Sequence, residues 1–376
     1  MLAKVPLRFT LHPHLTDENQ FAEAIYSMCC AKQIGLVLQE GYSLREPFRL
    51  KSVHSGVALD ATRLRSLKFM SARLTGLIAA PFTAFHNDGS LNLDMIERQA
   101  NFFVKNVISG AFICGTTGEG MSLSTDERLQ VAEKWMEVAP AQLRVIAHVG
   151  HQSLTESRAL AAHAEEIKVH AFATIAPTFY RVTNMDQLVD YCAQVASSAP
   201  SLPFYYYHMP AIAGADLPMV DFLKSASTRI RNLAGIKFTH ENLVDYSRCL
   251  QFEGGRFDIL FGRDEILLAA LALGGLGAIG STYNFMAPVY HRVIEAFNAG
   301  SIEDARKYQT IAMNIIAVMN RHGGLSAGKA MMKMTGYDCG PVRTPLENLS
   351  AEALESLTSE LKEIGFPFAA EQKVQP

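Results

Sequence analysis

Residues 110–149 read GAFICGTTGEGMSLSTDERLQVAEKWMEVAPAQLRVIAHV and contain the unit that decides the fold. Two short apolar runs, residues 110–114 and 144–149, flank a longer segment of helical period. That segment opens with Ser124-Thr125-Asp126-Glu127, which is a typical helix start. Because both apolar runs lack polar alternation, we expect parallel strands that are covered on both faces and joined by a crossover helix.

The same unit recurs about eight times from Leu74 onward. The other strands are predicted at residues 74–82, 171–177, 203–209, 233–239, 257–262 and 277–282. Eight strand-helix repeats predict a closed α/β barrel, the (β/α)₈ or TIM barrel, over residues 74–300, with the eighth helix at 288–298.

Both ends of the chain depart from this repeat. Helical patterns at residues 302–321, 326–335 and 351–364 predict a C-terminal helical annex, residues 301–376, packed on the barrel. Residues 1–73 lack the repeat and are predicted to be an N-terminal extension of unassigned role. Met70 would be a natural start just ahead of the first strand, so an alternative start and a functional extension both remain open.

Composition narrows the class of protein. With 49% hydrophobic and 19% charged residues, the 376-residue chain can bury a large core and is globular. Its net charge of −3 provides no basic field, so neither nucleic acid nor an anionic membrane surface is an expected partner. Six cysteines without CxxC spacing indicate reduced thiols and a cytoplasmic location. The sequence contains no apolar run long enough to span a membrane.

One lysine falls where TIM barrels place their chemistry, at the C-terminal end of a strand. Lys237 lies in Gly235-Ile236-Lys237-Phe238-Thr239, and if it points into the barrel, desolvation favours the free amine, which can attack a carbonyl. The alternative is an outward lysine that reaches solvent between helices. By alternation Tyr205 and Tyr207 share one face of the preceding strand, which places a phenol near the amine; ordinary aromatic packing explains them equally well.

A glycine-rich loop, Gly115-Thr116-Thr117-Gly118-Glu119-Gly120, follows the second strand. Its N–H groups and the hydroxyls of Thr116 and Thr117 can hold an anion, and a carboxylate suits them better than a phosphate because the Walker lysine is missing. The GxGxxG match at residues 275–280 enters a strand instead of leaving one, which excludes a dinucleotide site. The histidines form no convincing ligand pair with a carboxylate, so we expect no metal.

These motifs together resemble the N-acetylneuraminate lyases (sialic acid aldolases) of the dihydrodipicolinate synthase and N-acetylneuraminate lyase superfamily. The resemblance covers residues 74–368 in order and spacing, and residues 203–211, PFYYYHMPA, are similar to the animal branch. The motifs that carry it are Gly115 to Gly120, Tyr207-His208-Met209-Pro210-Ala211, Gly235 to Thr239, Gly262-Arg263-Asp264-Glu265 and Gly280-Ser281-Thr282-Tyr283-Asn284.

The resemblance implies a class I aldolase without cofactor that reversibly cleaves N-acetylneuraminate to N-acetyl-D-mannosamine and pyruvate, and that assembles as a homotetramer. It implies that Lys237 forms the Schiff base, that Tyr207 handles protons, and that Thr116 and Thr117 hold the keto acid carboxylate. The hydroxylated chain of the substrate would then be bound by Thr239, Gly262, Asp264, Glu265, Gly280 and Ser281.

Three alternatives stay open. Two are other pyruvate-dependent enzymes of the same superfamily, a dihydrodipicolinate synthase-like enzyme and a 2-keto-3-deoxy sugar acid aldolase, and the Asp264-Glu265 and Ser281 set discriminates them from the lyases. Dihydrodipicolinate synthases carry an arginine after the tyrosine motif, where this chain has Ala211-Ile212-Ala213-Gly214, which argues against the first. A catalytically silent scaffold of the same fold is the third. The chain also departs from the lyase pattern at Ala213, where Ser or Thr is usual, and at Phe179 and Tyr180, where bacterial members carry tyrosines.

Overall fold

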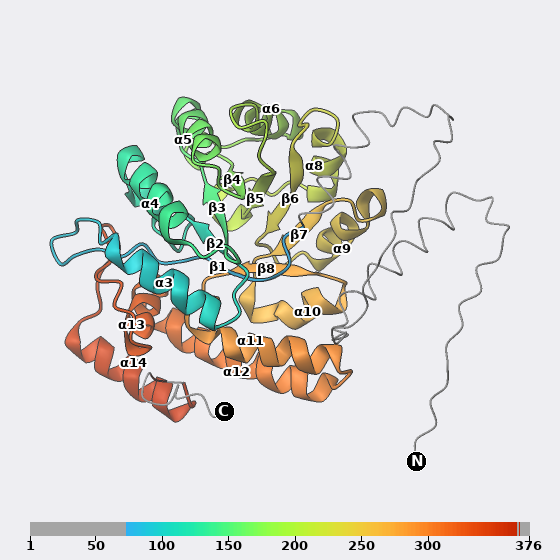
Figure 1. Cartoon of the computed structure of the whole chain (residues 1–376). Helices are drawn as coiled ribbons and strands as arrows, with labels where there is room; N and C mark the ends of the chain where they lie inside the picture. Colours follow the sequence, from blue (N-terminus) through green and yellow to red (C-terminus); the bar gives the residue numbers. More distant parts are fainter. Residues whose placement is uncertain (1–72, 367, 369–376) are drawn as a thin grey trace, which may run out of the picture. The chain divides into compact units, whose positions relative to one another are not determined.

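A computed structural model describes residues 73–366 and 368, which form a closed barrel of eight parallel strands surrounded by helices (Figure 1). The strands pair in chain order, and β1 pairs with β8 to close the barrel, which confirms the predicted fold. They are β1 (Gly76–Ala79), β2 (Gly110–Ile113), β3 (Arg144–His148), β4 (Ala171–Ile175), β5 (Phe204–His208), β6 (Leu233–Phe238), β7 (Asp258–Phe261) and β8 (Gly277–Gly280).

All eight predicted strands are present, but each ends earlier than its apolar run predicts. After β1, for example, Ala80 and Phe82 remain buried although they no longer pair in the sheet. Both residues line the pocket at the C-terminal ends of the strands. Apolar character therefore marks burial at these positions, not strand pairing.

Helices cover the outside of the barrel. They are α3 (Asp94–Lys105), α4 (Thr125–Val138), α5 (Leu154–Glu166), α6 (Met185–Ala196), α7 (Pro210–Ala213), α8 (Met219–Ala226), α9 (Leu243–Gln251), α10 (Leu267–Ala272) and α11 (Tyr283–Asn298), with short 3₁₀ turns η1 (Gly120–Ser122), η2 (Phe252–Gly254) and η3 (Asp264–Ile266). The start of α4 is the predicted one: Ser124 Oγ accepts from the N–H of Glu127 at 3.1 Å, and the Glu127 carboxylate accepts from the N–H of Ser124 at 2.9 Å.

The eighth helix corrects a predicted boundary. We expected it to begin at Pro288, but α11 begins at Tyr283 and contains that proline. Met286 has non-helical backbone angles (φ −123°, ψ 15°), so the helix is kinked two residues before the proline. The kink accommodates a residue that cannot donate a backbone hydrogen bond and would otherwise end the helix.

The annex consists of α12 (Ile302–Arg321), α13 (Leu325–Met334) and α14 (Ala351–Glu363), each within one residue of its predicted bounds. Helix α12 lies alongside α11 and also contacts η3, at the end of β7 (Figure 1). The predicted extension, apart from Arg73, lies outside the described residues. Within the described part, no helix is both long and apolar enough to cross a membrane.

A polar cluster closes the end of the barrel where the strands begin. Tyr205 donates its hydroxyl to Asp258 Oδ2 at 2.7 Å, and the N–H of Leu74 donates to the same oxygen at 3.0 Å. Arg73 Nε lies 3.7 Å from Asp258 Oδ1, and Arg144 donates to the backbone carbonyl of Arg73 at 3.1 Å. Tyr205 therefore belongs to this closed end, whereas Tyr207, two residues further along β5, lies toward the open one.

Candidate active site

A pocket of about 290 Å³ opens at the C-terminal ends of the strands, where TIM barrels place their chemistry. All ten residues singled out from the sequence line this one pocket. They are Thr116, Thr117, Tyr207, Lys237, Thr239, Gly262, Asp264, Glu265, Gly280 and Ser281.

Lys237 points into the barrel, not outward to solvent. It pairs in register with Tyr207 across β5 and β6, and only 5% of its surface is exposed. Its Nζ lies 3.9 Å from the centroid of the Tyr207 ring and 4.2 Å from that of Phe112. Two aromatic rings therefore shield an amine that borders the pocket, an arrangement suited to attack on a bound carbonyl.

Tyr207 lies between this amine and the glycine-rich loop, with its ring beside Lys237 and its hydroxyl toward the loop. The hydroxyl lies 3.3 Å from Thr116 Oγ1 and donates to the thioether sulfur of Met209 at 3.1 Å. The His148 ring packs edge-on against Tyr207 with centroids 5.8 Å apart. Burial, aided by the charge of Arg128, lowers the pKa of His148 to about 3, so this imidazole is neutral and adds no positive charge beside Lys237.

The glycine-rich loop needs its unusual backbone. Cys114 and Glu119 adopt left-handed conformations with φ of 55° and 51°. A Cβ at Gly120 would lie 1.9 Å from the carbonyl oxygen of Cys114, so only glycine fits there. Glu119 forms a buried ion pair with Lys329 of α13 at 2.7 Å, which ties the loop carrying Thr116 and Thr117 to the annex.

The opposite wall of the pocket presents acceptors without partners. Asp264 Oδ2 accepts from the N–H of Thr282 at 2.9 Å and from its hydroxyl at 2.7 Å, while Asp264 Oδ1 and Thr239 Oγ1 are buried and lack a hydrogen bond within the described chain. Burial raises the pKa of Asp264 to about 6, and the neighbouring Glu265 charge acts in the same direction. Such oxygens are suited to accept from the hydroxyl groups of a polyol.

Two glycines leave room for these oxygens. A Cβ at Gly280 would lie 1.9 Å from Asp264 Oδ1, and a Cβ at Gly262 would lie 1.9 Å from Thr239 Oγ1. Any side chain at either position would displace the polar wall. Both positions therefore require glycine for steric reasons, while their role in binding the substrate stays a prediction.

Sequence reasoning missed the contribution of the annex to the pocket. Part of one wall comes from α12, α13 and the turn between them, namely Ile316, Met319, Asn320, Gly324, Leu325 and Gly328. Met209, Arg263 and Thr282 also line the pocket. The annex residues follow the ordinary period of an amphipathic helix, so only the glycine pair Gly323-Gly324 marked this turn in the sequence.

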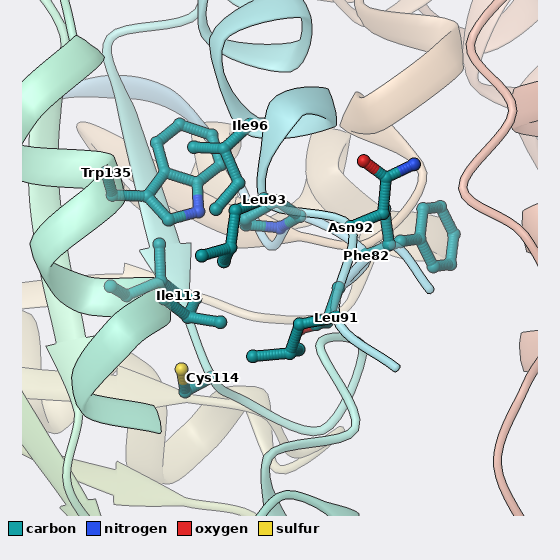
Figure 2. Close-up of a pocket in the computed structure, with 12 residues that line it drawn as sticks. Phe82, Leu91, Asn92, Leu93, Ile96, Ile113, Cys114 and Trp135 are labelled. Atoms are coloured by element: carbon teal, nitrogen blue, oxygen red, sulfur yellow. The ribbon is translucent and has the colours of Figure 1, made fainter. Parts of the chain in front are cut away.

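A second cavity lies between the start of α3, helix α4 and the C-terminal ends of β1 and β2 (Figure 2). Its walls are mostly apolar and include Trp135, Ile113 and Leu93, and its volume is about 10 Å³, enough for about one water molecule. It is too small for a substrate. In residues 73–366 and 368, no cluster of three or more His, Cys, Asp or Glu side chains is placed to hold a metal ion.

Comparison with known proteins identifies the family of this chain. The model of the dihydrodipicolinate synthetase family matches residues 73–364. N-acetylneuraminate lyase A of Xenopus laevis is 42% identical over 284 residues, which cover 74% of this chain and 93% of the relative. The solved structure of Proteus mirabilis N-acetylneuraminate lyase aligns with a TM-score of 0.76 and 41% identity, covering 78% of this chain and 99% of that one. YagE, a dihydrodipicolinic acid synthase family protein from E. coli K12 solved in complex with pyruvate, aligns with a TM-score of 0.72 and 25% identity, covering 78% and 99%. The chain belongs to the dihydrodipicolinate synthetase family.

Proposed function

We propose that this protein is a class I aldolase that reversibly cleaves N-acetylneuraminate to N-acetyl-D-mannosamine and pyruvate. The observation that carries the proposal is one pocket with two chemically different ends. One end holds the Lys237 amine and the Tyr207 hydroxyl, and the other holds buried acceptor oxygens of Asp264 and Thr239. The lyases of Xenopus laevis and Proteus mirabilis, each about 40% identical, support the same substrate.

The reaction begins with Lys237. Its free amine attacks C2 of the open-chain keto acid, and loss of water gives a protonated imine. Thr116 and Thr117 would bind the adjacent carboxylate, and the complex of YagE with pyruvate supports a keto acid at this kind of site.

Cleavage then uses the imine as an electron sink. The C4 hydroxyl loses its proton, the C3–C4 bond breaks, and its electron pair forms an enamine on C3 while C4 leaves as the aldehyde of N-acetylmannosamine. Tyr207, whose hydroxyl lies 3.3 Å from Thr116 and whose ring lies beside the Lys237 amine, relays the proton to C3. Water then hydrolyses the imine and releases pyruvate.

The polar wall would recognise the hydroxylated part of the substrate. In this proposal Asp264, Glu265 and Thr239 accept from hydroxyl groups, Ser281 adds its hydroxyl, and Gly262 and Gly280 keep the space open. A buried carboxylate without a second partner binds a hydroxyl donor strongly, because the charged acceptor is otherwise unsatisfied.

The test combines two measurements on the purified protein. Incubation with N-acetylneuraminate should release pyruvate, and borohydride with pyruvate should inactivate the enzyme and leave a reduced adduct on Lys237, found by peptide mapping. Lys237→Met is the control and should be neither active nor trapped. Trapping by pyruvate without cleavage of N-acetylneuraminate would favour another pyruvate-dependent aldolase, and no adduct at all would favour a silent scaffold.

Assembly and location follow from the same proposal. The resemblance to the lyases supports a homotetramer. The four cysteines in the described part, at positions 114, 192, 249 and 339, are free and buried, which suits the cytoplasm.

A further inference from the structure

A buried amide of the annex holds the loop that carries Asp264 and Glu265. Gln309 lies on α12, is 5% exposed, and does not line the pocket. Its Nε2 donates to the backbone carbonyls of Asp264 at 3.1 Å and Glu265 at 2.9 Å, and its Oε1 accepts from the N–H of Leu268 at 2.9 Å. Both amide hydrogens and one lone pair are therefore used.

These hydrogen bonds hold the backbone where η3 meets α10. Asp264 and Glu265 open η3, Leu268 lies in the first turn of α10, and Ile266 between them has non-helical angles (φ −131°, ψ 32°). Gln309 bridges the two short helices across that break. The Asp264 carbonyl also accepts from the N–H of Leu267. Without the bridge it would keep that partner, but the hydrogen bonds of Gln309 to the Glu265 carbonyl and from the Leu268 N–H would be lost where the chain changes direction.

The Asp264 carboxylate is held independently from the other side. Thr282, at the end of β8, donates two hydrogen bonds to Oδ2. Thr282 thus orients the side chain and Gln309 fixes the backbone beneath it. The unpartnered Oδ1 is directed to one place, where a Cβ on Gly280 would clash with it.

We propose that Gln309 is a positioning residue for the sugar end of the substrate and sets its affinity without touching it. This inference rests on the proposed function, since Asp264 and Glu265 are there assigned to the polyol. Lys237, Tyr207 and the loop with Thr116 lie on other elements and have no hydrogen bond to Gln309. Loss of the amide should therefore weaken binding at the sugar end of the site and leave the reaction of Lys237 with pyruvate nearly unchanged.

The test is Gln309→Met, which keeps the length of the side chain and removes all three hydrogen bonds. At saturating pyruvate, the KM for N-acetylmannosamine should rise about 10-fold or more, because small displacements of positioning groups are costly. The pyruvate concentration for half-maximal borohydride inactivation should change less than about 2-fold. Gln309→Glu keeps the acceptor for Leu268 but removes both donors, so it should resemble Gln309→Met.

The matched control is Asn232→Leu. Asn232 is also buried and donates to three backbone carbonyls, those of Ala196, Ala199 and Leu202, but it precedes β6 at the opposite end of the barrel. Asn232→Leu should lower the thermal midpoint. It should not change the ratio of the KM for N-acetylmannosamine to the pyruvate concentration for half-maximal inactivation. If Gln309→Met behaves like Asn232→Leu, or if both constants rise together, the inference is wrong.

Failure of the proposed function would look different. In that case wild type would be trapped by pyruvate but would condense no N-acetylmannosamine. The same ratio is then measured with whichever sugar aldehyde the wild type condenses with pyruvate. An unchanged KM for that aldehyde in Gln309→Met would overturn the inference on its own.

Discussion

At the residue scale, two tyrosines of one strand face have different surroundings, from which we predict different tasks. Tyr207 lies beside Lys237 and Thr116, whereas the Tyr205 hydroxyl donates to Asp258 at the closed end. Tyr207→Phe should lower kcat about 10² to 10⁴-fold with little change in stability, because it removes a proton relay. Tyr205→Phe should cost about 1–3 kcal/mol of unfolding free energy, because it leaves a buried carboxylate short of a donor, and should hardly change kcat.

Steady-state rates and urea midpoints of the two variants check this division. If Tyr205→Phe lowers kcat as much as Tyr207→Phe, the assignment of the relay to Tyr207 is wrong.

The raised pKa of Asp264 predicts that substrate affinity depends on pH. Because its pKa is raised to about 6, chiefly by burial, it is ionised at pH 7.5 and neutral at pH 5. A neutral carboxyl loses acceptor capacity, so the KM for N-acetylneuraminate should rise several-fold between pH 7.5 and 5. In Asp264→Asn the KM should be high at both values. A wild-type KM that is equal at the two pH values would contradict a role for the ionised form.

The same shift has a consequence for stability. The folded pKa lies above the unfolded value of 3.8, so the folded state gains from protonation, and that gain is lost as the pH rises through about 6. Asp264→Asn removes the cost of a buried charge and should raise the free energy of unfolding at pH 7.5 by on the order of 3 kcal/mol at most, and the thermal midpoint with it. The advantage should disappear below about pH 4, and thermal melts at the two pH values measure it.

Sequence reasoning reached the residues whose position follows from strand alternation, but not their partners. Lys237 and Tyr207 could be placed because period-2 alternation fixes the face of a strand residue. Gln309 could not, since a glutamine in an amphipathic helix carries no mark of the backbone that it will meet 45 residues earlier in the chain. Likewise, the buried state of Asp264 depends on Thr282 and the annex, which only the folded chain brings together.

At the element scale, apolar runs located all eight strands, and helical period located the annex. The predicted ends of several elements were wrong where tertiary contacts determine the end. The predicted strands were too long because residues such as Phe82 are buried at the pocket without pairing in the sheet. The predicted start of α11 at Pro288 was wrong because a kink at Met286 accommodates that proline inside the helix. The packing of α12 against η3 joins segments that no local pattern connects.

The buried ion pair between α13 and the glycine-rich loop should be worth more than a surface pair. Both side chains are almost fully buried, and Lys329 also donates to the carbonyl of Pro341 at 2.6 Å. Lys329→Met removes the counter-charge of the buried Glu119 carboxylate, which keeps the N–H of Arg343 as a donor at 2.8 Å, and should cost about 3–5 kcal/mol. Glu119→Gln combined with Lys329→Met should recover part of that loss, and urea unfolding of the single and double variants measures it. Equal losses in Lys329→Met and the double variant would show that the buried charge is not the cause.

At the scale of the whole molecule, the predicted extension should be dispensable for the barrel. The eight strands close on themselves, so the barrel leaves no unpaired edge for residues 1–72 to cover. Arg73 is different, because it contacts Asp258 and donates to the carbonyl of Gly255. A shortened chain that begins at Met70 keeps this arginine.

We therefore expect the chain from Met70 to release pyruvate at the full rate, with a thermal midpoint within a few degrees of the full chain, equivalent to about 1 kcal/mol. Arg73→Ala in the full chain is the matched variant and should lower the midpoint by more than the truncation does, because it removes contacts that tie the start of the barrel to Asp258 and to the turn before β7. Loss of turnover or of solubility in the shortened chain, with Arg73 still present, would place part of residues 1–72 in the working fold and move the predicted boundary upstream.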